Sequence, residues 1–240
     1  MTAETQDSQP LEERNRLLTV AGSASVSVAI SLIVLKLWAW WATLSVAMLS
    51  SFADSLLDLA ASLITLFALR FATTPADAEH RFGHGKSEAV AGVVQAMIIT
   101  GSALFVAWRV IERFMNPLPL TEPGVGYLVV GVSFVLTAAL VIFQSWVVRR
   151  TGSIAVKADA AHYRADLLTT IALAGALYCS TQLGWLYADP IFGSFVVLLI
   201  LASVREIIVA ALRDLLDREL PDDDRDAIER IALAHAAVLG

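Results

Sequence analysis

The stretch SFADSLLDLAAS, residues 51–62, places two carboxylates inside a run of apolar residues. Asp54 and Asp58 lie four residues apart, and mostly apolar residues flank them from Leu44 to Leu69. That run is long enough to cross a bilayer as a helix, which takes about 20 mostly apolar residues. An ionised Asp at the centre of such a helix costs about 2.5–3.5 kcal/mol on insertion scales. The two carboxylates therefore predict a bound cation, a proton or a counter-charge within the membrane.

The composition of the whole chain agrees with a membrane protein that crosses the bilayer several times. Of the 240 residues, 57% are hydrophobic and only 17% are charged, and the mean hydropathy is +0.68. These values are too apolar for a soluble domain of this size. We expect an all-α membrane protein, a bundle of six transmembrane helices near residues 17–41, 44–70, 88–112, 124–148, 154–179 and 189–212.

The distribution of Lys and Arg predicts the orientation of this bundle. With the N-terminus inside, the cytoplasmic loops and ends collect most of the cations, and the opposite side has at most Arg109 and Arg113. Both termini are therefore expected in the cytoplasm. The predicted organisation is a cytoplasmic tail over 1–16, a six-helix transmembrane domain over 17–213, and the first, incomplete part of a cytoplasmic C-terminal domain over 214–240.

The polar residues of the second predicted span share one face of the helix. At about 100° per residue, they fall within a stripe roughly 100° wide that contains Ser51, Asp54, Ser55, Asp58, Ser62 and Thr65. Helix–helix packing accounts for the Ser and Thr residues. It does not account for the two carboxylates.

The fifth predicted span separates its charges around the helix, and its first half is too polar to stand out by hydropathy. Asp159, His162 and Asp166 share one face, and Lys157 and Arg164 share the other. We expect the acidic face to point into the bundle. The basic face can reach the membrane interface or lipid phosphates.

Two pairs in these spans predict a metal site. Asp54 with Asp58 and His162 with Asp166 are each spaced i, i+4, which places the Cβ atoms of a pair about 5–6 Å apart on one face. Together they supply three carboxylates and one imidazole, and four is the number of ligands that tetrahedral Zn²⁺ takes. Fe²⁺, Mn²⁺ and Cd²⁺ also accept such a set. Structural ion pairs with a lysine of the first span or an arginine of the fifth are the alternative, and they leave the repeated spacing unexplained.

The loop between the second and third spans contains a further candidate site. Within TTPADAEHRFGHGKSE, residues 73–88, Asp77 precedes His80 by three residues, and His84 follows four residues later. An Asp/His/His set suits Zn²⁺ with one open position. A solvated surface loop is the alternative, since Gly and Pro make helical spacing uncertain there.

These motifs together resemble the cation diffusion facilitator family, and most closely its bacterial zinc and iron exporters of the dimeric six-span type. The motifs run in the family's order and cover nearly the whole chain from about residue 17: DSLLD (54–58), PADAEHRFGHGKSE (75–88), NP (116–117), HYRAD (162–166), ADPIFG (188–193) and LLDRELP (215–221).

The resemblance implies roles for the residues. It implies a transport site within the membrane, made of Asp54, Asp58, His162 and Asp166. It implies a second metal site of lower affinity in the loop, made of Asp77, His80 and His84. It also implies a charge interlock near a dimer interface, made of Lys86 and Asp217. Family members usually continue into a cytoplasmic α/β domain, and residues 221–240, with apolar Ile228, Ile231, Val238 and Leu239, look like its first helix.

The expected function is efflux of a divalent metal, Zn²⁺ first and also Fe²⁺ or Cd²⁺, in exchange for protons. His162 is the expected titrating ligand, since an unperturbed His pKa is about 6.5 and a metal binds the deprotonated ring. A passive cation channel and a non-transporting family member are the alternatives. An enzyme is not expected, and an intramembrane metalloprotease in particular is disfavoured because no HExxH motif occurs. The resemblance further implies a homodimer in the inner cell membrane, with metal ions, protons and lipid as partners, no cofactor besides the transported metal, and no nucleic acid.

Overall fold

The computed structural model describes residues 9–44, 46–116, 126–217 and 222–234, and over these residues its regular structure is all-helical. The predicted fold class is confirmed to that extent. The helices are α2 (Gln9–Thr43), α3 (Val46–Ala72), α4 (Ser87–Met115), α5 (Gly126–Thr151), α6 (Ile154–Leu183), α7 (Ala188–Leu215) and α8 (Asp222–Leu233).

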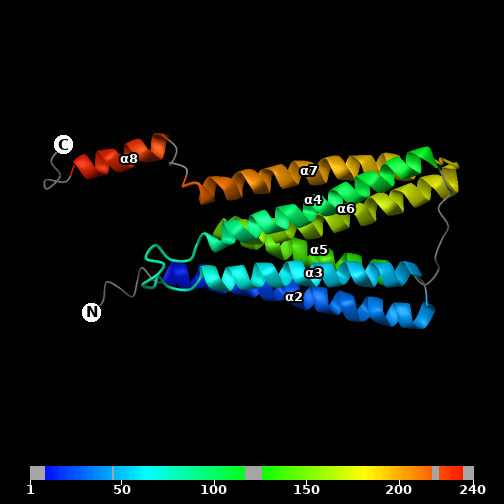
Figure 1. Cartoon of the computed structure of the whole chain (residues 1–240), viewed down its shortest axis with the longest axis horizontal. Helices are drawn as coiled ribbons and strands as arrows, with labels where there is room; N and C mark the ends of the chain where they lie inside the picture. The colour runs from blue at the N-terminus through cyan, green and yellow to red at the C-terminus, as the bar shows by residue number, and fades with distance from the viewer. Residues whose placement is uncertain (1–8, 45, 117–125, 218–221, 235–240) are drawn as a thin grey trace.

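Six long helices, α2 to α7, run along one another as an elongated bundle (Figure 1). Helix α2 packs against α3 and α5, α4 packs against α7, and α6 contacts each of the other five. The start of α2, the loop over residues 73–86 and the end of α7 lie at one end of the bundle, on the left in Figure 1. We call this the loop end.

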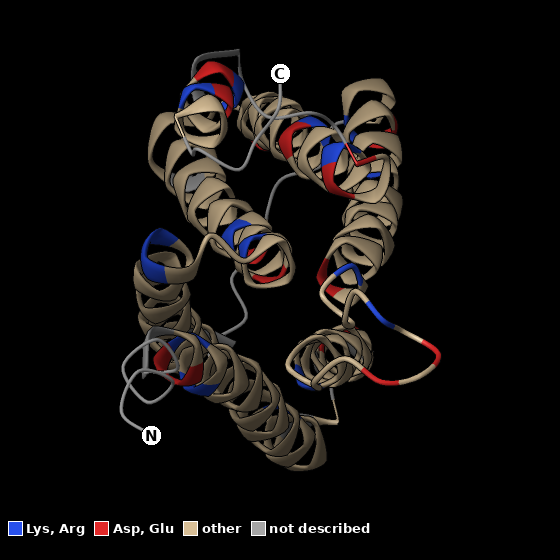
Figure 2. Ribbon diagram, turned by 90° about the vertical axis from the view of Figure 1, so that its left-hand side faces the viewer, with Lys and Arg blue, Asp and Glu red and all other residues tan. Residues whose placement is uncertain are grey.

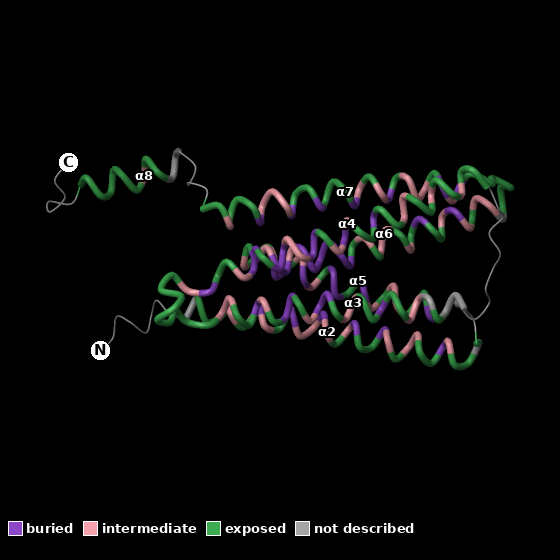
Figure 3. The backbone as a smooth tube through the Cα atoms, in the orientation of Figure 1, coloured by how far each residue is buried: buried purple, intermediate pink, exposed green. Residues whose placement is uncertain are grey.

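Five of the six helices, α2, α3, α4, α5 and α7, are long and apolar enough to cross a membrane. Helix α6 has 30 residues and is equally long, but the charged residues in its first half make it too polar by composition. Six helices therefore lie where six spans are predicted, and crossing by α6 stays a prediction. Figure 3 shows buried segments on the inward faces of the helices and exposed segments on the outward faces.

Charged residues concentrate near the ends of the helices. Figure 2, which views the bundle from the loop end, shows blue and red ribbon at the near ends and long uncharged stretches behind them. At the opposite end both arginines of α4 are paired: Arg109 lies 2.9 Å from Glu112, and Arg113 lies 3.6 Å from Asp189. Unpaired positive charge is thus scarce at the end predicted to face away from the cytoplasm.

One buried carboxylate connects three helices at the loop end by hydrogen bonds. Glu88 of α4 accepts a hydrogen bond from Arg14 of α2 at 2.8 Å and another from the Ser153 hydroxyl. Ser153 is also the N-cap of α6, where its side chain accepts a bond from the Val156 backbone N–H. An N-cap of this kind satisfies one of the free N–H groups at a helix start. Ser153 therefore starts α6 at a position fixed relative to α2 and α4.

The ends of the chain differ from the predicted organisation in detail. Helix α2 already begins at Gln9, so the second half of the predicted tail over 1–16 is helical. In the predicted C-terminal region, Ile228 and Ile231 of α8 are exposed. Val238, Leu239, Pro117 and residues 218–221 lie outside the described residues.

Candidate metal centre

Helices α3 and α6 bring three of the four predicted transport ligands together. One ligand atom each from Asp58, His162 and Asp166 lies within 4.8 Å of the other two. His162 Nε2 lies 3.0 Å from Asp58 Oδ1 and 4.0 Å from Asp166 Oδ2. A mixed oxygen and nitrogen set of this kind suits Zn²⁺ and related divalent metals.

The fourth predicted ligand, Asp54, is not part of this cluster. It is exposed, and it lies within electrostatic range of Lys36 and Asp58. Lys36 instead donates a 2.7 Å hydrogen bond to Ser55, and Arg164 on α6 donates one to a serine of α5. Neither cation forms an ion pair with Asp54 or Asp58 in the described part of the chain. The structural ion pairs are therefore not seen, and ligation by Asp54 stays a prediction.

Exposure of the predicted ligands increases with distance from the loop end. Helix α3 runs toward the loop end and α6 runs away from it, so Asp54 and Asp166 both lie on the far side of Asp58 and His162. The side chains of His162 and Asp58 are 7% and 14% exposed, and that of Asp166 is 47% exposed. Along the bundle axis, the predicted ligands are therefore more exposed toward the end opposite the loop.

On the loop side of the cluster lies a buried polar layer. Asp159 of α6 is fully buried. Its carboxylate accepts hydrogen bonds from Ser25 of α2 at 2.5 Å and from Gln144 of α5 at 2.6 Å. Gln95 of α4 lies 3.4 Å from the second oxygen and donates a bond of 2.8 Å to Thr65 of α3. The sequence predicted that Asp159 points inward, but it did not predict which residues contact Asp159. Gln95 and Gln144 were the available signal, because an amide side chain inside an apolar span needs a polar partner.

The predicted loop residues Asp77, His80 and His84 also lie together. Asp77 Oδ1 is 3.3 Å from His80 Nδ1, and Asp77 Oδ2 is 3.4 Å from His84 Nε2. The centres of the two imidazole rings are 4.5 Å apart. Hydrogen bonds from the backbone N–H groups of His80 and then of Glu79 hold the pKa of the Asp77 carboxyl below its usual value. The loop thus presents an ionised carboxylate and two imidazoles in one cluster.

A cavity of about 880 Å³ adjoins the loop cluster at the loop end, and its walls include His80, His84 and Glu88. Lys86, another of its lining residues, forms a 2.7 Å ion pair with Asp217. This pair joins the residue before α4 to a residue just after α7 within one chain. The place of this pair near a dimer interface stays a prediction.

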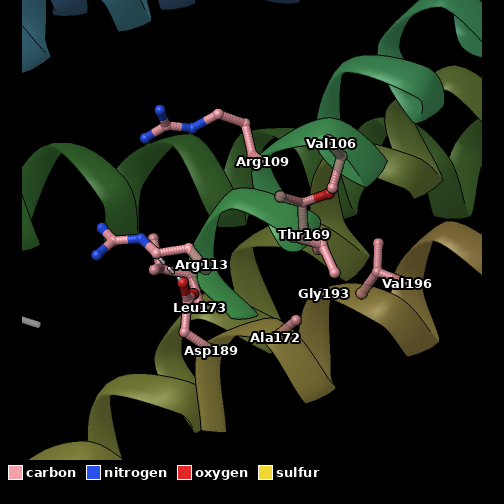
Figure 4. A pocket seen from close by; sticks show the side chains of 10 residues that line it. Val106, Arg109, Arg113, Thr169, Ala172, Leu173, Asp189, Gly193 and Val196 are labelled. Atoms are coloured by element: carbon pink, nitrogen blue, oxygen red, sulfur yellow. Dashed lines mark ion pairs between the residues drawn. The ribbon is translucent and has the colours of Figure 1, made fainter. Parts of the chain in front are cut away.

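The opposite end holds a smaller pocket of about 260 Å³ between α4, α6 and α7 (Figure 4). The dashed line in Figure 4 joins Arg113 to Asp189, and Arg109 extends beside them. Among the described residues that line this pocket, Asp189 alone is of a metal-ligating type. These residues do not make up a set of ligands for a metal centre.

Comparison with known proteins agrees with the ligand geometry. Residues 23–216 match the family described as the cation efflux transmembrane domain. The cation-efflux pump FieF of Escherichia fergusonii is 43% identical over 225 residues, which cover 94% of this chain and 75% of that pump. The FieF pump of Escherichia coli strain K12 / DH10B gives the same identity and coverage.

The match extends over most of the chain, includes the helices that carry the metal-ligating clusters, and confirms the resemblance noted from the motifs. The chain therefore belongs to the cation diffusion facilitator family of cation efflux transporters, and it is a membrane transporter rather than an enzyme.

Proposed function

We propose that this transporter exports divalent metal ions, with Zn²⁺ as the preferred substrate, in exchange for protons through Asp54, Asp58, His162 and Asp166. The single observation that carries this proposal is the cluster of Asp58, His162 and Asp166 between α3 and α6. Asp54 lies one turn away on α3 and supplies the fourth ligand. Fe²⁺, Cd²⁺ and Mn²⁺ are the competing substrates.

Exchange with protons follows from the chemistry of the ligands. A metal binds carboxylates and the neutral imidazole, so its arrival releases any protons that these groups hold. His162 lies between two carboxylates, and an imidazole titrates near physiological pH when unperturbed. Protons entering from outside would displace the metal, and metal entering from the cytoplasm would displace the protons.

The proposed topology has six spans, with α6 included and both termini in the cytoplasm of the inner membrane. The environment of its charged residues supports crossing by α6. Asp159 and His162 are buried, Arg164 donates a 2.7 Å bond to Ser145 of α5, and Lys157 lies 3.5 Å from Glu206 of α7. Charged groups inside membranes are expected to face the bundle or to be paired in this way.

Two further parts of the proposal concern the loop end. The cluster of Asp77, His80 and His84 would bind a second metal ion with lower affinity at the cytoplasmic face. The functional unit would be a homodimer, with Lys86 and Asp217 near the interface. The ion pair within one chain supports the partnership of these two residues.

Uptake into proteoliposomes tests the proposal. Purified chain is reconstituted, and Zn²⁺ uptake is followed by an internal fluorescent indicator with and without an imposed pH gradient. We expect the gradient to accelerate uptake and Asp58→Ala to abolish it. Asp189→Ala in the opposite pocket is the control and is expected to transport normally.

Each alternative gives a different result. Uptake that ignores the pH gradient would indicate a passive channel. Zn²⁺ binding without uptake would indicate a non-transporting family member. Repeating the assay with Fe²⁺, Cd²⁺ and Mn²⁺ ranks the substrates.

A further inference from the structure

One carboxylate at the centre of the bundle collects polar groups from neighbouring helices but takes no part in the ligand cluster. Asp159 of α6 is fully buried. Ser25 of α2 and Gln144 of α5 lie 2.5 Å and 2.6 Å from its Oδ2 atom. Gln95 of α4 lies 3.4 Å from Oδ1, and its amide also bonds to Thr65 of α3. Five helices therefore meet at this network.

The geometry accommodates Asp159 both with and without a proton. Ser25 has a single hydroxyl hydrogen and lies 2.5 Å from Asp159 Oδ2 and 3.2 Å from the Ala21 carbonyl oxygen. When Asp159 is ionised, the hydroxyl donates to the carboxylate. When Asp159 is protonated, the acid donates to Ser25 and the hydroxyl turns to Ala21. Rotation of one hydroxyl thus satisfies both states without moving a heavy atom.

Two hydrogen-bond acceptors in the network also lack a donor. Three buried side-chain atoms in the described part of the chain have no hydrogen-bond partner, and two of them are the Oε1 atoms of Gln95 and Gln144. Unpaired buried acceptors are rare and costly in folded proteins. A proton on Asp159 adds one hydrogen-bond donor to a network in which acceptors are left without donors.

Among the described residues, the charged groups that act most strongly on Asp159 belong to the proposed metal site. They are Asp58 on α3 and His162 on α6, and Tyr163 on α6 is also in electrostatic range. Helices α2, α4 and α5 present the neutral Ser25, Gln95 and Gln144. Among the described residues no hydrogen bond or ion pair joins Asp159 to a proposed ligand. A charge on Asp159 would therefore act on the metal through space and not through a shared ligand.

We propose that Asp159 is a proton-binding site of the transporter, distinct from the metal ligands and located on their loop side. This inference rests on the proposed metal/proton antiport. In the absence of metal the carboxylate takes up one H⁺ and becomes a neutral acid. Arrival of the divalent cation releases that H⁺, because an ionised Asp159 stabilises the positive charge nearby.

Counting the protons released on metal binding tests this site. Zn²⁺ is titrated into wild type and Asp159→Asn in weakly buffered detergent solution with a pH indicator. We expect Asp159→Asn to bind Zn²⁺ and to release up to one proton fewer per ion. The Zn²⁺ affinity should rise with pH by up to about tenfold per pH unit for each proton that binding releases. In Asp159→Asn this rise should therefore be up to about tenfold smaller per pH unit than in wild type.

Asp189→Asn is the matched control, because this half-buried acid pairs with Arg113 far from the network. It is expected to release as many protons as wild type. If Asp159→Asn does not fold, Asp159→Ser is measured in its place. The infrared difference spectrum of wild type needs no variant: Zn²⁺ must remove a carbonyl band of a protonated acid, and the lack of such a loss at every pH overturns the inference.

The two proposals fail in different ways. If wild type releases no proton on binding Zn²⁺, the antiport itself is wrong. If wild type releases protons and the Asp159 variants release as many, only the assignment of Asp159 is wrong.

Discussion

At the scale of single residues, the two acidic residues of α3 differ although they lie one turn apart. Asp58 contacts His162 at 3.0 Å and is 14% exposed, whereas Asp54 is exposed and stands outside the ligand cluster. Four residues advance a helix by about 400°, so Asp54 and Asp58 differ by about 40° in direction and about 6 Å in height. These offsets separate Asp58, which already contacts His162, from Asp54, which lies outside the cluster of the other three predicted ligands.

The contact of Asp58 with His162 predicts unequal effects of the two acids on metal affinity. In a background of His80→Ala and His84→Ala, we expect Asp58→Asn to weaken Zn²⁺ binding about 100-fold or more. We expect Asp54→Asn to weaken Zn²⁺ binding only about tenfold, because Asp54 is exposed and lies outside the cluster, and tenfold is the low end of the loss typical of groups around a metal. Competition with a chromogenic chelator measures both constants. Equal losses would contradict the arrangement described.

The loop cluster predicts that Asp77 acts both in folding and in binding. Its Oδ1 atom accepts hydrogen bonds from the backbone N–H groups of Glu79 and His80, at 2.9 Å and 2.6 Å. Because these bonds lower the pKa of the Asp77 carboxyl group, they stabilise the folded loop fully at a pH above the pKa that this group has in the unfolded chain. This stabilisation is lost as the pH falls through the lower pKa that the Asp77 carboxyl group has in the folded protein.

Substitutions separate the two roles of Asp77. Asn keeps an oxygen for the backbone bonds and removes the charge, so Asp77→Asn should keep the loop conformation and lose metal affinity. Asp77→Ala should lose both. Limited proteolysis of the loop and Zn²⁺ titration at the loop site provide the measurements. A loop in Asp77→Asn that is cleaved as fast as in Asp77→Ala would refute this assignment.

At the scale of elements, the sequence predicted the helices well and their contacts poorly. Helix α6 was predicted from its polar face rather than from hydropathy, and that face does point inward at Asp159 and His162. A helical wheel shows which way a residue points, but it does not show which residues of other helices lie opposite. The bonds of Asp159 to Ser25 and Gln144 come from helices 134 and 15 residues away in the sequence. Only the packed bundle defines them.

Close packing of α4 against α7 predicts a site that does not tolerate a methyl group. A Cβ atom at Gly193 of α7 would lie 2.6 Å from the Cγ2 atom of Val110 on α4. Val is stiff about χ1, so Gly193→Ala should destabilise the bundle by about 1–3 kcal/mol. Gly131 of α5 has no atom within 4 Å of the same position. Gly131→Ala should therefore be neutral or stabilising by up to about 1 kcal/mol. Thermal unfolding in detergent compares the two, and equal melting temperatures would contradict the close approach.

At the scale of the whole molecule, the proposed metal site is buried toward the loop end and more exposed toward the opposite end. Toward the loop end, Glu88 accepts hydrogen bonds from Arg14 and Ser153 and so connects the helices. Ser62 and Thr65, which lie on the same side, are fully buried. Away from the loop end the ligands become more exposed. With the loop end in the cytoplasm, as proposed, this asymmetry is what we expect of a state that releases metal to the outside.

This asymmetry predicts which positions of α3 react with a reagent added from outside. Cys179, the one native cysteine, is first replaced by Ser, and single cysteines are then introduced in reconstituted vesicles of defined orientation. Asp54→Cys should react with a membrane-impermeant maleimide from the side opposite the loop. Ser62→Cys should not react, because Ser62 is fully buried and bonds to Tyr163 at 2.8 Å.

Phe82→Cys in the exposed loop controls for orientation, because it should react only from the loop side. Reaction of both Asp54→Cys and Phe82→Cys from the same side would refute the proposed topology. Reaction of Ser62→Cys from the loop side alone would instead indicate a state open to the cytoplasm. Since alternating access exposes a midplane site to one side at a time, a proton gradient that favours export should shift the reactivity of Ser62→Cys and Asp54→Cys in opposite directions. A parallel shift would mean that the two sides of the site open together.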